Sequence, residues 1–195
     1  REAVRRLCKD FPGSYWQSLD RSRTYPADFV RALTDSGFVS VLIPEEYGGS
    51  GLGLSAATAV LEEIHRAGCN GGACHAQMYT MGTLLKHGST EQKDQFLPQI
   101  ASGDLRLQAF GVTEPESGTD TTRIRTFARR EGDYYLVSGQ KIWISRAEYS
   151  DLMVLLVRTQ KREEVDRPSK GLSVLLVDMR DALGKGLTIR PIRTM

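Results

Sequence analysis

Residues 110–120 read FGVTEPESGTD, and this stretch lies where the periodicity of the chain changes. It combines an apolar start, a Glu-Pro pair and a glycine flanked by hydroxyl side chains. Glycine and proline allow a close approach of the backbone, and the hydroxyls of Thr113, Ser117 and Thr119 can donate to an anion or to a heteroaromatic edge. From spacing alone, a turn with capping hydroxyls is an equally good interpretation.

The chain before this stretch has a helical period. Apolar residues recur three and four positions apart, and Ser, Pro and Gly stand at the segment ends. We predict helices over residues 1–11, 26–37, 55–66, 74–87 and 89–103, with a glycine-rich loop over residues 43–53. Ser55 and Ser89 are the expected N-cap residues. The first domain, residues 1–105, is therefore expected to be an all-α helical bundle.

The chain after residue 105 has the spacing of short strands. We predict strands over residues 134–138, 141–145, 152–157, 172–177 and 187–192, a tight turn at residues 131–133 and an exposed loop over residues 161–170. Such spacing favours an antiparallel sheet. The expected fold class is α+β, with the helical bundle followed by an antiparallel β-barrel or sandwich over residues 106–195. A last strand without a closing element indicates a fragment of a longer chain.

The composition excludes several classes of protein. Among 195 residues, 26 are basic and 24 acidic, a net charge of +2, so no strong field indicates nucleic acid or anionic membrane as a partner. The longest apolar runs, LMVLLV at 152–157 and LSVLLV at 172–177, are too short to span a bilayer. Three cysteines without a disulfide pattern indicate a reducing compartment, the cytoplasm or alternatively the mitochondrial matrix.

Three further patterns have plain interpretations. The run GGSGLG at 48–53 lacks a lysine after it, so a loop between helices is favoured over a phosphate site. Cys69, Cys74 and His75 lack metal-ligand spacing, so we expect buried thiols and no metal site. The arginines of residues 123–130 are followed by acidic residues, so a solvated strand face is favoured.

Residues 141–145 read KIWIS. On a strand, Trp143 and Ser145 would lie on one face because alternate residues share a face. A buried core tryptophan is the simpler interpretation of Trp143.

FGVTEPESGTD followed by GQKIWIS resembles the acyl-CoA dehydrogenases, whose pattern is close to [YF]-x-[LVM]-T-E-P-x-x-G-[ST]-D and then K-x-[WYF]-I-[TS]. IPEEYGGSGL at 43–52 and HGSTEQKDQFLPQIASGD at 87–104 are similar to N-terminal segments of that family. The resemblance implies an N-terminal α domain, a middle β domain and a C-terminal helical domain. The C-terminal domain would be absent from these 195 residues.

The resemblance also implies contacts with FAD and with an acyl-CoA substrate. The implied cofactor-binding residues are Phe110, Val112, Thr113, Thr119, Trp143, Ile144 and Ser145. Thr119 would also touch the bound acyl-CoA, and Ser169 matches a position against its CoA portion. Met78, Tyr79 and Met81 match a region that lines the acyl pocket, although a core role is an equally good interpretation.

The implied reaction is α,β-desaturation of a fatty or branched acyl-CoA, with proton abstraction by a glutamate and hydride transfer to flavin N5. That glutamate is expected beyond residue 195, so no catalytic residue is assigned here and the fragment alone is expected to be inactive. The implied partners are an electron acceptor such as an electron-transfer flavoprotein and further copies in a homodimer or homotetramer. Alternatives are a non-catalytic binding or assembly protein of the same fold, and an acyl-CoA oxidase or flavin monooxygenase.

Overall fold

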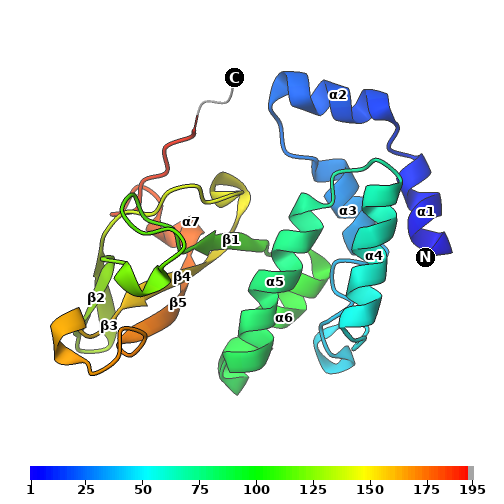
Figure 1. The fold of residues 1–195 in the computed structure, drawn as a ribbon. Helices are drawn as coiled ribbons and strands as arrows, with labels where there is room; N and C mark the ends of the chain where they lie inside the picture. Colours follow the sequence, from blue (N-terminus) through cyan, green and yellow to red (C-terminus); the bar gives the residue numbers. More distant parts are fainter. Residues whose placement is uncertain (193–195) are drawn as a thin grey trace. The chain divides into compact units, whose positions relative to one another are not determined.

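A computed structural model describes residues 1–192 of the chain (Figure 1). The chain divides into two compact units, Arg1–Gln108 and Ala109–Met195. No helix among the described residues is long and apolar enough to cross a membrane.

The first unit is helical (Figure 1). Its helices are α1 (Glu2–Lys9), α2 (Gly13–Ser22), α3 (Ala27–Asp35), α4 (Leu54–Arg66), α5 (Gly72–His87) and α6 (Thr90–Ser102), and a short 3-10 turn, η1 (Glu45–Tyr47), lies in the loop after α3. The predicted helical segments are confirmed, whereas α2 was not predicted.

The core of this unit explains why α2 forms without a strong helical pattern. Trp16 of α2 donates its indole N–H to the carbonyl of Phe11 at 3.1 Å. Its ring lies edge-on to Phe29 of α3, with centroids 4.9 Å apart. Phe29 is 1% exposed, so two aromatic residues of α2, Tyr15 and Trp16, attach this helix to the core.

The two expected serine caps have different outcomes. Ser89 caps α6: its hydroxyl accepts from the Gln92 amide at 3.2 Å, and the Gln92 side chain accepts from the Ser89 amide at 3.0 Å. The prediction for Ser55 is wrong because α4 begins one residue earlier, at Leu54, after Gly53 in the N-cap position.

A buried carboxylate joins α1 to α4. The Glu63 side chain is fully buried and accepts from Arg5 Nε at 2.5 Å and from Arg1 Nη1 at 2.7 Å. Hydrogen bonds from the Arg5 and Arg1 side chains lower the pKa of Glu63 to about 2.

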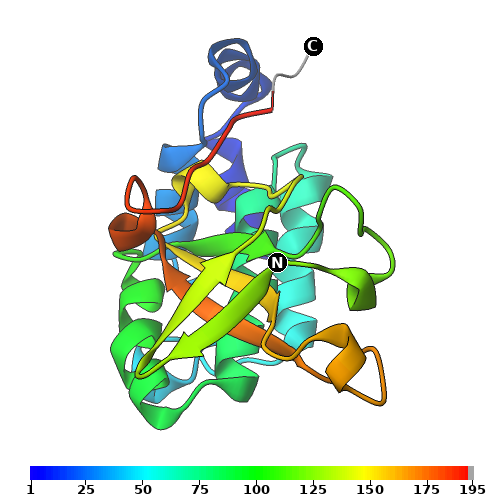
Figure 2. The same ribbon diagram turned by 90° about the vertical axis from the view of Figure 1, so that its left-hand side faces the viewer.

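The second unit contains a mixed sheet (Figure 2). Its elements are β1 (Leu107–Gly111), which begins two residues before the unit, β2 (Phe127–Glu131), β3 (Tyr134–Ser138), β4 (Leu152–Arg158), β5 (Leu172–Asp178) and α7 (Met179–Ala182). The strand order is β1-β4-β2-β3, and β5 also pairs with β4. The β2–β3 hairpin turns at Gly132, which has a φ of 62°, as predicted for residues 131–133.

Three expectations for this unit are corrected. The sheet is not wholly antiparallel because β2 pairs in parallel with β4, through Phe127 and Arg158. Its strands form an open sheet over the described residues, not a closed barrel. Residues 141–145 and 187–192 are not strands.

Local backbone geometry explains why residues 141–145 do not form a strand. Trp143 and Arg146 have positive φ angles of 61° and 60°, which turn the chain out of the extended conformation. Leu187 makes one isolated bridge to Leu183, and the described residues after it join no ladder. The α+β class itself is confirmed.

Candidate functional site

The Glu-Pro stretch forms a tight turn. The Glu114 amide donates to the Ser117 carbonyl at 2.9 Å, and the Ser117 amide donates back to the Glu114 carbonyl at 3.2 Å. The Ser117 hydroxyl donates to the Asp120 carbonyl at 2.6 Å, and the Asp120 carboxylate accepts from the Thr122 amide at 3.1 Å. The loop is therefore ordered by its own hydrogen bonds.

The Glu114 carboxylate fixes this turn to the rest of the unit. It accepts from the backbone amides of Arg125, at 2.6 Å, and Thr126, at 3.0 Å, and from Lys141 Nζ at 2.8 Å. Burial raises the pKa of Glu114, but these hydrogen bonds outweigh burial and bring the pKa to about 2. Burial lowers the pKa of Lys141, and its bond to Glu114 opposes that effect.

The two sequence motifs lie side by side. Lys141 Nζ also donates to the Val112 carbonyl at 2.9 Å, and the Ile142 amide donates to the Thr113 carbonyl at 2.8 Å. Residues 112–113 are therefore held directly against residues 141–142, although they are far apart in the sequence.

The next residue, Trp143, presents its ring to solvent. It is 66% exposed, so the interpretation as a buried core tryptophan is wrong. Its φ of 61° is unusual for a bulky residue. The residue before it, Ile142, is held by a hydrogen bond from its amide to the Thr113 carbonyl. Ser145 is also exposed, and because this segment is not a strand, the alternation of strand residues does not apply to it and Trp143.

The site's donor set suits a flat heteroaromatic ring rather than a metal. An exposed indole, the half-buried Ile144 and the hydroxyls of Thr113 and Ser145 offer an apolar surface with short hydrogen-bonding groups. Within residues 1–192, no group of three or more His, Cys, Asp or Glu side chains could hold a metal ion.

Family models match almost all of the chain. The model described as acyl-CoA dehydrogenase, N-terminal domain, matches residues 1–104, and the model described as acyl-CoA dehydrogenase, middle domain, matches residues 109–195. The chain belongs to the acyl-CoA dehydrogenase family.

Relatives of the chain carry different names. The chain is 32% identical over 185 residues to a 3-(aryl)acrylate reductase of Clostridium sporogenes, covering 92% of this chain and 48% of that protein. It is 39% identical over 166 residues to acyl-CoA dehydrogenase FadE29 of Mycobacterium tuberculosis, covering 84% and 41%. The chain thus spans about half the length of the curated relatives it matches.

A solved structure supports the fold of this family member. The glutaryl-coenzyme A dehydrogenase glutaryl-CoA complex superposes with a TM-score of 0.81 at 31% identity, covering 92% of this chain and 46% of that chain.

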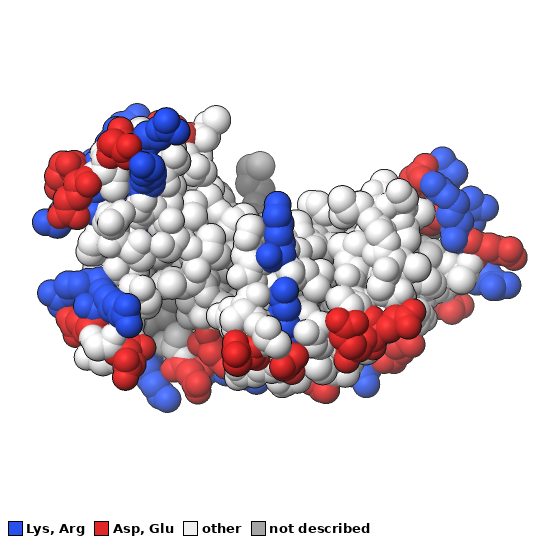
Figure 3. Space-filling model, turned by 90° about the horizontal axis from the view of Figure 1, so that it is seen from below, with Lys and Arg blue, Asp and Glu red and all other residues white. Residues whose placement is uncertain are grey.

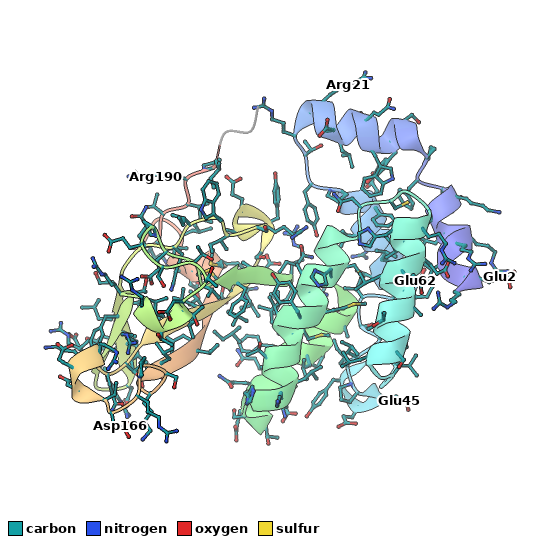
Figure 4. The ribbon with its side chains drawn as sticks, viewed as in Figure 1. Glu2, Arg21, Glu45, Glu62, Asp166 and Arg190 are labelled. Atoms are coloured by element: carbon teal, nitrogen blue, oxygen red, sulfur yellow. The ribbon has the colours of Figure 1, made fainter. Side chains whose placement is uncertain are left out.

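The remaining expected site residues lie in two loops and at the end of β1. Phe110 is half-buried near the end of β1, and Thr119 is exposed in the loop that follows. Ser169 is exposed in the loop before β5, which also carries Asp166, labelled in Figure 4 and paired with Lys170 at 3.0 Å.

The residues expected to shape an acyl pocket differ in their exposure to solvent. Met78 and Met81 are 5% and 0% exposed, so they belong to the core of the first unit. Tyr79 is 42% exposed and lies against the His75 ring, with centroids 5.2 Å apart.

The structure agrees with the interpretation of residues 48–53 as a loop, of the cysteines as buried thiols and of the arginines as solvated. The glycine-rich loop folds back on the chain, with the Gly51 amide donating to the Ile43 carbonyl at 2.8 Å. The three cysteines are free and buried, and burial raises the pKa of Cys8 and Cys74 to about 12. The arginines of residues 123–130 are exposed, and Arg125 and Arg129 pair with Glu116 and Glu131. Figure 3 likewise shows basic and acidic side chains interspersed on the face that it draws.

Sequence reasoning missed the residues that hold the site together. Glu114 stands in a motif that also contains Glu116 and Asp120, so the sequence does not single it out as the partner of Lys141. Arg158, at the end of an apolar strand, is likewise not singled out by the sequence.

Proposed function

We propose that this chain forms the FAD-binding part of an acyl-CoA dehydrogenase that desaturates a thioester between Cα and Cβ. The observation that carries the proposal is that Trp143 is exposed and has a positive φ, while its neighbour Ile142 is hydrogen-bonded to Thr113. The chain around this site matches both family models.

In the proposed site, the chain's own residues bind and orient the isoalloxazine ring. The Trp143 indole would lie against the ring and exclude water from it. The hydroxyls of Thr113 and Ser145 would donate to ring heteroatoms, and Phe110, Val112 and Ile144 would supply apolar contact. The chemistry that FAD supplies when bound is the acceptance of a hydride.

Two further residues are proposed to bind the phosphate-bearing parts of the ligands. The exposed Thr119 hydroxyl would donate to the FAD pyrophosphate region and to the acyl-CoA, and the exposed Ser169 would contact the CoA portion. Each offers a neutral donor to an anion.

The proton-transfer partner is proposed to come from residues beyond 195. An α proton of a thioester is weakly acidic, so a carboxylate must take it while hydrogen bonds stabilise the developing enolate. We accordingly propose that these 195 residues alone are inactive. A further proposal is that the active protein is a homodimer or homotetramer in the cytoplasm or the mitochondrial matrix and passes electrons to an electron-transfer flavoprotein.

Turnover assays on the full-length protein test this function. With FAD and a saturated acyl-CoA, we expect an enoyl-CoA product and reduction of an artificial electron acceptor. Stoichiometric hydrogen peroxide from oxygen would instead indicate an acyl-CoA oxidase. No product with any thioester would favour the monooxygenase or the non-catalytic alternative.

A further inference from the structure

Arg158, at the end of β4, is a buried cation whose partners are carbonyl groups. It is 5% exposed. Its Nε donates to the Ile124 carbonyl at 3.1 Å, and its Nη2 donates to the carbonyls of Thr122, at 2.5 Å, and Pro168, at 3.0 Å. The guanidinium therefore contacts two loops that lie more than 40 residues apart in the sequence.

Ion pairing does not explain why an arginine occupies this position. Among the described residues, no ion pair involves Arg158, and its Nη1 has no hydrogen-bond partner. A buried charge is costly unless polar groups solvate it. Three carbonyls do so here, and a planar guanidinium, with its fixed fork of donors, can reach all three at once.

Each of the two loops carries a residue proposed to bind ligand. Thr122 and Ile124 follow Thr119 in the first loop, and Pro168 immediately precedes Ser169 in the second. The backbone of Arg158 is itself held in place. Its amide donates to the Thr126 carbonyl at 2.8 Å, and it is a strand partner of residues in both β2 and β5.

We infer that Arg158 is a positioning residue that fixes the Thr119 loop and the Ser169 loop in one arrangement, and so couples FAD binding to binding of the CoA portion of the substrate. This inference rests on the proposed function. Arg158 itself touches neither ligand; it acts through the backbone of both loops.

Amide hydrogen exchange of the protein without ligands tests the structural half of this inference. In Arg158→Met, the amides of residues 122–124 and 169–171 should lose protection together, while those of residues 153–156 of β4 should keep it. Arg158→Lys should give a smaller loss, since an ammonium keeps the charge but cannot span three carbonyls. If either loop keeps wild-type protection in both variants, the inference is wrong.

Ligand binding by the full-length protein tests the functional half. For Arg158→Met we expect the dissociation constant for FAD and the KM for acyl-CoA each to rise about 10-fold, with kcat at saturating FAD within about twofold of wild type. Arg158→Lys should lie between. Arg129→Met is the matched control, because Arg129 is exposed on β2 and pairs only with Glu131 among its described partners; it should leave both constants unchanged.

The outcomes separate this inference from the proposed function. A fall in kcat with both constants unchanged, or a change in one constant alone, contradicts the coupling. If Arg158→Met does not fold, the same comparison is made with Arg158→Lys, in which both constants must still rise together. A wild-type protein that binds no FAD contradicts the proposed function, whereas hydrogen exchange still reports whether Arg158 holds the two loops.

Discussion

Lys141 Nζ lies 2.8 Å from Glu114 Oε1, and these side chains are only 9% and 6% exposed. The pair joins two motifs that are 27 residues apart in the sequence. Because Glu114 also accepts from two backbone amides and Lys141 also donates to Val112, neither charge is left without further partners. The pair thus places Thr113 and Trp143 on neighbouring segments.

Glu114→Gln should destabilise the second unit. The substitution preserves size but leaves the buried Lys141 without its counter-charge, which we expect to cost about 3 kcal/mol in the free energy of unfolding. Urea unfolding followed by circular dichroism measures this. Glu116→Gln is the control: Glu116 pairs with Arg125 on the surface, and its loss should cost less than about 1 kcal/mol. Equal costs for the two variants would refute a structural role for the buried pair.

The stability contributed by Glu114 should depend on acidity. Its pKa of about 2 in the folded chain is below the ordinary value of 4.5, so the unfolded chain binds the proton first. The contribution is therefore full above about pH 4.5 and is lost as the pH falls toward 2. The difference in unfolding free energy between wild type and Glu114→Gln should shrink over that range. Glu63, with a similar pKa, adds the same dependence in the first unit, so Glu63→Gln is measured alongside. A difference that stays constant across this range would contradict the assignment.

Trp143→Ala should weaken FAD binding without unfolding the protein. A ring that is 66% exposed contributes little to the core, but stacking on a flavin should be worth about 10-fold in the dissociation constant. Equilibrium dialysis with FAD measures the dissociation constants of wild type and variant. Tryptophan fluorescence then locates the site, because the chain has two tryptophans and Trp16 packs in the first unit. In Trp16→Phe the quenching by FAD should persist. Quenching that disappears in Trp16→Phe and persists in Trp143→Ala would show that the flavin is elsewhere.

Gly49→Ala should destabilise the first unit. A Cβ at this position would lie 2.1 Å from the Ile43 carbonyl oxygen, so the backbone must move, at an expected cost of about 3 kcal/mol. Gly13→Ala is the control because its Cβ would meet nothing within 4 Å. Thermal unfolding of both variants provides the comparison, and an unchanged midpoint for Gly49→Ala would show that the loop relaxes freely.

Periodicity predicted the parts of the fold that pack on a single face. The helices with recurring apolar residues formed, and the Ser89 capping box was readable because a hydroxyl stands three residues before a glutamine. Residues 141–145 resemble a strand because they form a short run with two β-branched isoleucines. The positive φ of Trp143 and the buried amine of Lys141 depend on contacts with residues 112–114, which local sequence does not encode.

The site residues also fall into those that the sequence indicates and those that only the fold reveals. The motifs indicated Thr113, Trp143 and Ser145, and the structure places their segments together. Residues that act by supporting a loop, such as Glu114 and Arg158, bond mainly to backbone atoms brought close by the sheet. Such contacts leave no spacing rule in the sequence, so they became visible only in the folded chain.

An anaerobic spectral titration tests the central claim most directly. The full-length, FAD-loaded protein would be mixed with saturated acyl-CoAs of increasing chain length while the flavin absorbance is recorded. The account predicts bleaching of the flavin band by one range of chain lengths, which would establish the reductive half-reaction and identify the substrate class together. A flavin spectrum that no thioester changes would contradict the proposed dehydrogenase activity.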